Sequence, residues 1–128
     1  MKALSLAVVG LPYPNRRGVS RRFEAQLCAP GEPIEFRPEP ENKHDRWAVA
    51  VYSCRGVQIG YVNAEKAAWI GGMIRQGREI AAIFQGIAHS TAWVRVAFDG
   101  EQPTLPQQSA PDETEDDSGF YPDPVYDD

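Results

Sequence analysis

A short polar loop carries the side chains best suited to chemistry. The segment Glu39-Pro40-Glu41-Asn42-Lys43-His44-Asp45 offers an amide, an ammonium, an imidazole and a carboxylate at four successive positions. Asn and Asp side chains bond nearby backbone, which can fix such a loop without a helix or a strand ladder. His44 and Asp45 could form an acid–base pair, but adjacent residues rarely orient each other in that way, and the sequence places no Ser or Cys nucleophile beside them. The pattern favours a ligand-binding loop, with a purely structural loop as the alternative.

A second candidate segment lies near the N-terminus, at Leu11-Pro12-Tyr13-Pro14-Asn15. The flanking prolines hold Tyr13 in a rigid loop, where its ring could stack on a nucleic-acid base or cover the rim of the core. Basic residues follow and could contact phosphates, although such a run is more often a solvated surface; they are Arg16, Arg17, Arg21 and Arg22. Tyr61, which follows Gly60, fits either the core or the site.

Strands that must position these loops can be placed from the hydrophobic pattern. Apolar and alternating runs predict strands at residues 3–9, 34–37, 47–53, 57–62, 79–88 and 92–98. Trp47 is expected in the core at the start of its strand, whereas Trp69 could be partly exposed. This order, with one clear helix, predicts a mainly β protein and a small β-barrel or curled sheet.

The helical pattern is clear in one segment and ambiguous in another. Asn63 is expected to cap a helix over about residues 64–76, whose buried face carries Ala67, Ile70 and Ile74. Residues 21–29 fit either a short helix, in which Phe23 and Leu27 pack on one face, or a strand.

Charge divides the chain into two unlike parts. All 13 Lys and Arg and 9 of the 18 acidic residues lie in residues 1–100, so this body carries +4 and residues 101–128 carry −9. The body is expected to be one domain, and the acidic, proline-rich tail, poor in aliphatic residues, to be disordered. A mildly basic body is compatible with a polyanionic partner.

Several classes of protein are disfavoured by the composition. Cys28 and Cys54 have no metal-ligand spacing, and the chain has two histidines, so neither a metal nor another cofactor is expected. No apolar run is long enough for a membrane span or a signal sequence, which makes the cytoplasm the expected location.

Three motifs taken together resemble the HIRAN domain. They are Val8-Val9-Gly10-Leu11-Pro12-Tyr13, the run from Arg37 to Asp45 followed by Ala48-Val49-Ala50-Val51, and Ile59-Gly60-Tyr61-Val62 leading into the helix. The resemblance covers about residues 4–98. This domain stands at the N-terminus of the eukaryotic helicase-like transcription factor and its relatives and also occurs alone in bacteria. Because no helicase portion accompanies it here, we expect a stand-alone module of the bacterial kind.

The resemblance implies an OB-like β-barrel that binds single-stranded DNA at a free 3′ end. By position, Tyr13 matches a tyrosine of the family's pocket, His44 stands where a second ring lies, Asp45 matches the carboxylate that takes the 3′-hydroxyl, and Asn42 matches the asparagine that shapes the pocket. Pro12 stands where the helicase-type domain has an arginine, so a phosphate contact is lost unless a nearby base replaces it; the candidates are Arg16, Arg17 and Lys43.

The function expected from the sequence is therefore non-enzymatic binding of single-stranded DNA with a free 3′-hydroxyl end, in DNA repair or replication-fork processing. Tyr61 is included among the expected binding residues. A repair protein, helicase or nuclease could bind through the acidic tail, and no membrane partner is expected. The alternative is a protein-interaction module of the same fold that does not bind DNA.

Overall fold

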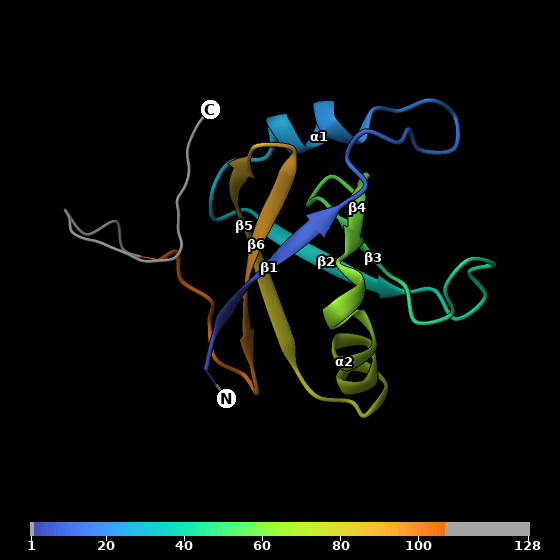
Figure 1. Ribbon diagram of the computed structural model, residues 1–128. Coiled ribbons are helices and arrows are strands. Elements are labelled where there is room, and N and C mark those ends of the chain that lie inside the picture. Colours follow the sequence, from blue (N-terminus) through green and yellow to red (C-terminus); the bar gives the residue numbers. More distant parts are fainter. Residues whose placement is uncertain (1, 107–128) are drawn as a thin grey trace.

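The computed structural model describes residues 2–106, which form a closed antiparallel β-barrel with two helices (Figure 1). The strand order around the barrel is β1-β4-β3-β2-β5-β6, and β6 pairs with β1 to close it. The mainly β, barrel-type prediction is confirmed. The elements are β1 (Leu4–Val9), α1 (Arg21–Leu27), β2 (Pro33–Pro38), β3 (Val49–Tyr52), β4 (Gln58–Val62), α2 (Ala64–Arg75), β5 (Ile80–Ala88) and β6 (Thr91–Phe98).

Aliphatic and aromatic side chains from every strand fill the barrel. In the β1–β6 ladder, for example, Leu6 pairs with Val94, and both are buried. The apolar pattern stops at Phe98, and residues 101–106 form neither helix nor strand. The predicted disorder of the acidic tail concerns mainly residues 107–128, which lie outside the described residues. Neither helix in the described part is long and apolar enough to cross a membrane.

Helix α2 follows the sequence pattern closely. The Asn63 side chain caps it by accepting a hydrogen bond from the Lys66 N–H at 3.2 Å, and Ala67, Ile70 and Met73 are buried. Gly71 lies against β3, where an added Cβ would sit 3.4 Å from Cγ2 of Val49. At that distance an alanine Cβ would make ordinary van der Waals contact, so α2 packs closely on the barrel here without requiring a glycine.

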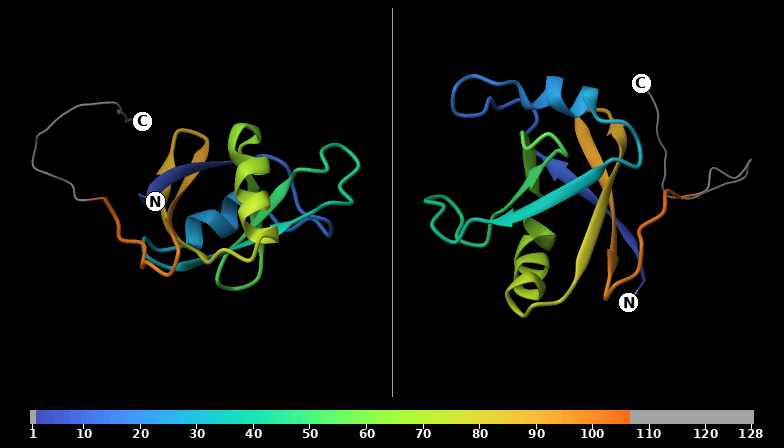
Figure 2. Two further views of the ribbon diagram at one scale, coloured as in Figure 1. Left: turned by 90° about the horizontal axis from the view of Figure 1, so that it is seen from below. Right: turned by 180° about the vertical axis from the view of Figure 1, so that it is seen from behind.

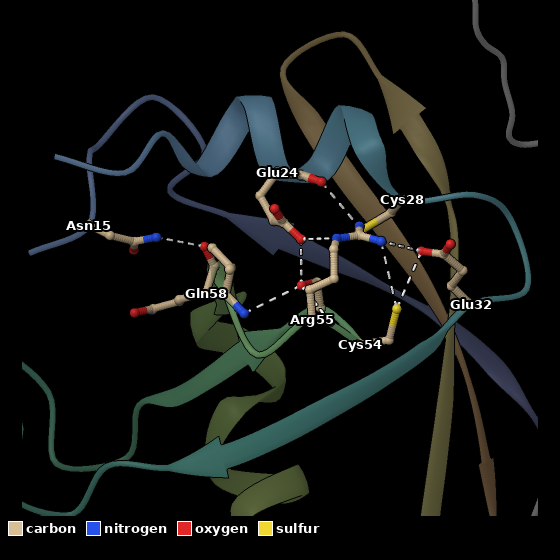
Figure 3. Close-up of polar contacts among 9 residues, drawn as sticks. Asn15, Glu24, Cys28, Glu32, Cys54, Arg55 and Gln58 are labelled. Atoms are coloured by element: carbon tan, nitrogen blue, oxygen red, sulfur yellow. Dashed lines mark hydrogen bonds and ion pairs between the residues drawn. The ribbon is translucent and has the colours of Figure 1, made fainter. Parts of the chain in front are cut away.

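Helix α1 contradicts the expected packing. The segment is a helix, capped by Ser20, whose Oγ accepts from the Phe23 N–H at 3.0 Å, but Phe23 and Leu27 are 60% and 50% exposed. Glu24 is buried instead, because its Oε2 accepts hydrogen bonds of 2.6 Å from both Ser53 Oγ and Arg55 Nε (Figure 3). Hydrogen bonds to these distant partners outweigh the burial of Phe23 and Leu27 that the local apolar pattern favours. The helix is therefore turned so that the Glu24 carboxylate faces inward.

The prediction that Trp47 begins a buried strand is also wrong. β3 begins at Val49, and Trp47 is 43% exposed. The chain turns first, since the Ala48 N–H donates to the Asp45 carbonyl at 3.0 Å and the Trp47 N–H donates to Asp45 Oδ1 at 2.9 Å. Trp69 is partly exposed, at 37%, and its ring lies 5.7 Å from that of Phe98.

Two long loops extend from the same side of the barrel, and residues 101–106 leave it on the opposite side (Figures 1 and 2). We call them the 10–20 loop, which joins β1 to α1, and the 39–48 loop, which joins β2 to β3. Helix α1 lies across one end of the barrel and contacts β4, while α2 contacts β3.

Candidate nucleic-acid interface

Asn42 organises the 39–48 loop. Its N–H donates to the Glu39 carbonyl and its Nδ2 donates to Glu39 Oε1, each at 3.0 Å. Its Oδ1 accepts from the backbone N–H groups of His44 at 2.9 Å and Asp45 at 3.0 Å. One amide thus satisfies both of its own polar ends and fixes the backbone that carries the next three side chains.

The three side chains after Asn42 differ in exposure. Lys43 and His44 are exposed, and Asp45 is half-buried. Asp45 Oδ1 accepts the Trp47 N–H, and within residues 2–106 no hydrogen bond is made to Asp45 Oδ2. In the same part of the chain no hydrogen bond joins the His44 ring to the Asp45 carboxylate, so the two do not form an aligned acid–base pair. Asp45 therefore helps to fix the loop with one oxygen and can accept a further hydrogen bond with the other.

Tyr61 connects the two loops. Its hydroxyl donates to Glu39 Oε1 at 2.9 Å, the oxygen that Asn42 also contacts, and the Arg21 guanidinium lies 5.4 Å from its ring centroid. Burial raises the pKa of the Tyr61 phenol, which keeps the donated proton in place. Its neighbour Gly60 is needed for close approach of β1, because an added Cβ there would collide with the Val9 carbonyl oxygen. Tyr61 is thus fixed between Arg21 and Glu39.

Asn15 and Arg21 anchor the 10–20 loop to the barrel. Asn15 Nδ2 donates to the Gln58 carbonyl at 2.8 Å, and Asn15 Oδ1 accepts from Arg21 Nε at 2.8 Å. Arg21 Nη1 also donates to the Gly10 carbonyl at 3.2 Å, where the Tyr13 N–H closes a turn at 3.1 Å. Arg21 is therefore engaged in the loop's own structure.

Tyr13, Arg16 and Arg17 lie on the surface of the anchored 10–20 loop. Tyr13 is 69% exposed, and both arginines are exposed. The chain of contacts from Arg21 through Tyr61 and Glu39 to Asn42 ties this loop to the 39–48 loop. All the predicted site residues thus belong to these two connected loops or to the tyrosine between them.

Trp47 is a surface ring that the sequence analysis assigned to the core. It stands two residues after Asp45, with the guanidinium of Arg46 4.9 Å and that of Arg75 5.5 Å from its ring. The sequence signal that could have placed it outside is Asp45, because an Asp side chain often bonds the backbone N–H two residues on and so extends a turn. A half-exposed indole flanked by two cations is suited to stacking against a flat, negatively charged ligand.

Other polar clusters do not extend this interface. Within residues 2–106, no group of three or more His, Cys, Asp and Glu residues could hold a metal ion. A hollow of about 270 Å³ is lined by residues of β2, α2 and β5 and includes none of the predicted site residues; its lining is Ile34, Glu35, Phe36, Ile74, Arg78 and Ile80. The candidate interface therefore consists of exposed loop side chains.

Comparisons with known proteins identify the fold. The crystal structure of the HIRAN domain of human HLTF matches with a TM-score of 0.59 and 20% identity over 75% of this chain and 74% of that chain. A crystal structure of a protein from Lactobacillus plantarum matches with a TM-score of 0.62 and 17% identity over 73% and 90%. The NMR structure of the HLTF HIRAN domain in its DNA-bound conformation matches with a TM-score of 0.54 and 21% identity over 75% and 73%. No curated protein matches the sequence significantly.

The family model of the HIRAN domain matches residues 1–99, which includes every strand, both helices and both loops. The matched segment ends one residue after β6. This chain belongs to the HIRAN domain family.

Proposed function

We propose that this protein is a non-enzymatic module that binds single-stranded nucleic acid and prefers DNA with a free 3′-hydroxyl end. Support comes from family membership, from the DNA-bound conformation solved for the HLTF domain, and from the two connected loops. The observation that carries the proposal is the 39–48 loop, whose backbone Asn42 fixes while one oxygen of Asp45 keeps its accepting capacity.

Each exposed side chain has a distinct part in this proposal. The rings of Tyr13 and His44 stack on terminal bases, and each stacked base contributes about 1–3 kcal/mol. Trp47 adds a further ring beside Asp45. Lys43 and the arginines of the 10–20 loop contact phosphates in place of the arginine that Pro12 replaces, and Tyr61 acts by holding the two loops together. One or two stacked bases with a few ion contacts correspond to roughly micromolar binding.

End recognition follows from the chemistry of a carboxylate. A 3′-hydroxyl can donate to Asp45 Oδ2, and a hydrogen bond to a charged acceptor contributes about 1.5–3 kcal/mol. An ionised 3′-phosphate offers no donor and sets two negative groups together. The expected preference for 3′-hydroxyl over 3′-phosphate ends is therefore about tenfold or more.

A titration with labelled oligonucleotides tests the proposal. Linear strands with a 3′-hydroxyl, linear strands with a 3′-phosphate and circular strands are compared at two salt concentrations by fluorescence anisotropy. Asp45→Asn removes the repulsion with little change of shape, so binding of 3′-phosphate ends should recover. Tyr13→Ala should weaken all single-stranded ligands alike.

Two outcomes would contradict this function. Equal binding of all three ligands by the wild-type protein would leave Asp45 as a loop-fixing residue without a role at the DNA end. Absence of binding at low salt would favour the alternative, a protein-interaction module of the same fold. If the proposal holds, we infer that the protein acts in repair or replication-fork processing, with a helicase or nuclease as its partner.

A further inference from the structure

Helix α1 presents apolar side chains to solvent. Phe23 and Leu27 lie one turn apart on one face of the helix, and Val19 directly precedes its capping residue, Ser20. Their exposed fractions are 60%, 50% and 47%. We call these three residues the α1 apolar face. Exposed apolar side chains that gather on one face are typical of interaction surfaces when the patch is large.

Tertiary hydrogen bonds of Glu24 keep this face of α1 exposed. Rotating α1 to bury Phe23 and Leu27 would withdraw Glu24 from its two 2.6 Å hydrogen bonds with Ser53 and Arg55 (Figure 3). Glu24 is 5% exposed, and removing a buried carboxylate from its partners is strongly unfavourable. The α1 apolar face therefore stays outward unless another surface covers it.

Basic residues accompany the α1 apolar face. Arg16 and Arg17 are exposed on the 10–20 loop, and Arg22 is half-buried on α1 itself. A ligand that fits this combination has aromatic or aliphatic side chains interspersed with negative charge. The chain contains such a segment, because Phe120, Tyr121, Val125 and Tyr126 stand among the nine acidic residues of 101–128, which has no Lys or Arg.

The tail is long enough to reach α1. Phe120 lies fourteen positions after Pro106, and an extended chain of fourteen steps spans up to about 46–50 Å. A compact domain of 100 residues is roughly 35 Å across. Residues 101–106 leave the barrel on the side away from the two loops. Helix α1 lies across the end of the barrel that joins these two sides (Figures 1 and 2). Tethering gives such a segment an effective concentration that can reach the millimolar range.

We propose that the α1 apolar face is the docking site for the chain's own C-terminal segment, residues 120–126. Phe120, Tyr121 and Tyr126 cover Val19, Phe23 and Leu27, while the surrounding acidic residues face Arg16, Arg17 and Arg22. This docking does not require DNA binding, since it rests on the exposed face and on the composition of the tail; Arg16 and Arg17 belong to both proposed contacts, so the tail and a nucleic acid would compete for them.

Photo-crosslinking of the full chain tests the docking. The photoreactive analogue p-benzoylphenylalanine replaces Phe120, and mass spectrometry maps the products after irradiation at low protein concentration. We expect intramolecular crosslinks to residues 19–27. Phe23→Ser combined with Leu27→Ser should lower their yield roughly tenfold, which corresponds to about 1.4 kcal/mol of lost contact. The salt dependence of the yield should show a decrease at high ionic strength.

Gln26→Ser is the matched control, because Gln26 is an exposed polar residue of the same helix and its loss removes no apolar contact. Its crosslink yield should match that of the unsubstituted helix, and the melting temperatures of all variants should agree because the changed side chains are exposed. Crosslinks that map elsewhere, an unchanged yield in the Phe23/Leu27 variant, or mainly intermolecular products from a second copy would each overturn the proposal.

Discussion

The 39–48 loop and helix α1 both present side chains to solvent, but different interactions hold them in place. In the loop, Asn42 bonds Glu39, His44 and Asp45, all within three residues of itself. In α1, Glu24 bonds Ser53 and Arg55, which are 29 and 31 residues away. The loop is therefore stabilised by local contacts, whereas the orientation of the helix depends on tertiary contacts that form only when the barrel closes.

Reactivity of Cys28 should give the largest effect, and it tests the α1 side of the comparison. Cys28 is the residue that caps the C-terminal end of α1, and it is 8% exposed. Burial raises the pKa of its thiol to about 11, from an ordinary value near 9. At pH 8 only roughly one Cys28 in a thousand is then a thiolate, so it should react with iodoacetamide at least a hundredfold more slowly than exposed Cys54.

The raised pKa of Cys28 also makes the free energy of unfolding depend on pH. Between about pH 9 and pH 11 the unfolded chain loses a proton that the folded chain keeps, so the free energy of unfolding should fall over that range. Cys28→Ala should remove this part of the pH dependence in urea titrations. Equal labelling of both cysteines in the native protein would show that α1 is not seated as described.

Removing Glu24 should give the next largest effect. Glu24→Ala removes the acceptor that Ser53 and Arg55 share, leaves Arg55 its longer 3.5 Å contact with Glu32, and should lower the free energy of unfolding by about 2–3 kcal/mol in urea titrations. Cys28 labelling should accelerate in the same variant because α1 loosens. Gln26→Ala is the control, with an expected change below about 0.5 kcal/mol; comparable losses in the two variants would contradict a specific role for the buried carboxylate.

The outcome for α1 shows what local sequence could and could not predict. The barrel, the cap at Asn63 and the loop-fixing pattern at Asn42 were predictable, because periodicity and short side chains act over a few residues. The outward face of Phe23 and Leu27 was not, because nothing near Glu24 in sequence indicates a partner at Arg55. Trp47 was misplaced for a similar reason, since its strand-like neighbours concealed a turn closed by Asp45. The link from Tyr61 to Glu39, 22 residues apart, also depends on the closed barrel.

Substitution of Asn42 should have a smaller effect on stability, and it tests directly whether local contacts hold the 39–48 loop. Asn42→Ala removes three side-chain hydrogen bonds and should cost about 1–2 kcal/mol of stability, since the loop is partly solvated. Asn42→Asp keeps the Oδ1 acceptor for His44 and Asp45 but puts a carboxylate oxygen in place of the donor 3.0 Å from Glu39 Oε1, so repulsion between the two carboxylates should offset much of what the retained bonds recover. Chemical unfolding of both variants measures this; an unchanged stability in Asn42→Ala would mean that the prolines alone fix the loop.

The tail should have a modest effect on ligand binding, if the proposed function is correct. Nine acidic residues tethered to a basic body compete with DNA, so deletion of residues 101–128 should tighten binding of single strands several-fold at low salt and less at high salt. Anisotropy titrations of the two chain lengths measure the difference. Unchanged affinity at low salt would indicate that the tail serves another partner.

The smallest expected effect is that of the same deletion on folding. Residues 1–100 retain both helices and all six strands, and also the paired contact at the end of β6, where Arg78 Nη2 and Nε donate to the two oxygens of Asp99 at 2.9 and 3.2 Å. The Asp99 N–H still reaches the Glu79 carbonyl at 2.8 Å. Docking of residues 120–126 on an exposed helix face adds little to a barrel that closes without it. A chain ending at Gly100 should therefore melt cooperatively, with a free energy of unfolding within about 0.5 kcal/mol of the full chain. Loss of the cooperative transition in calorimetry would place the domain boundary beyond Gly100 and would make the tail part of the folded unit.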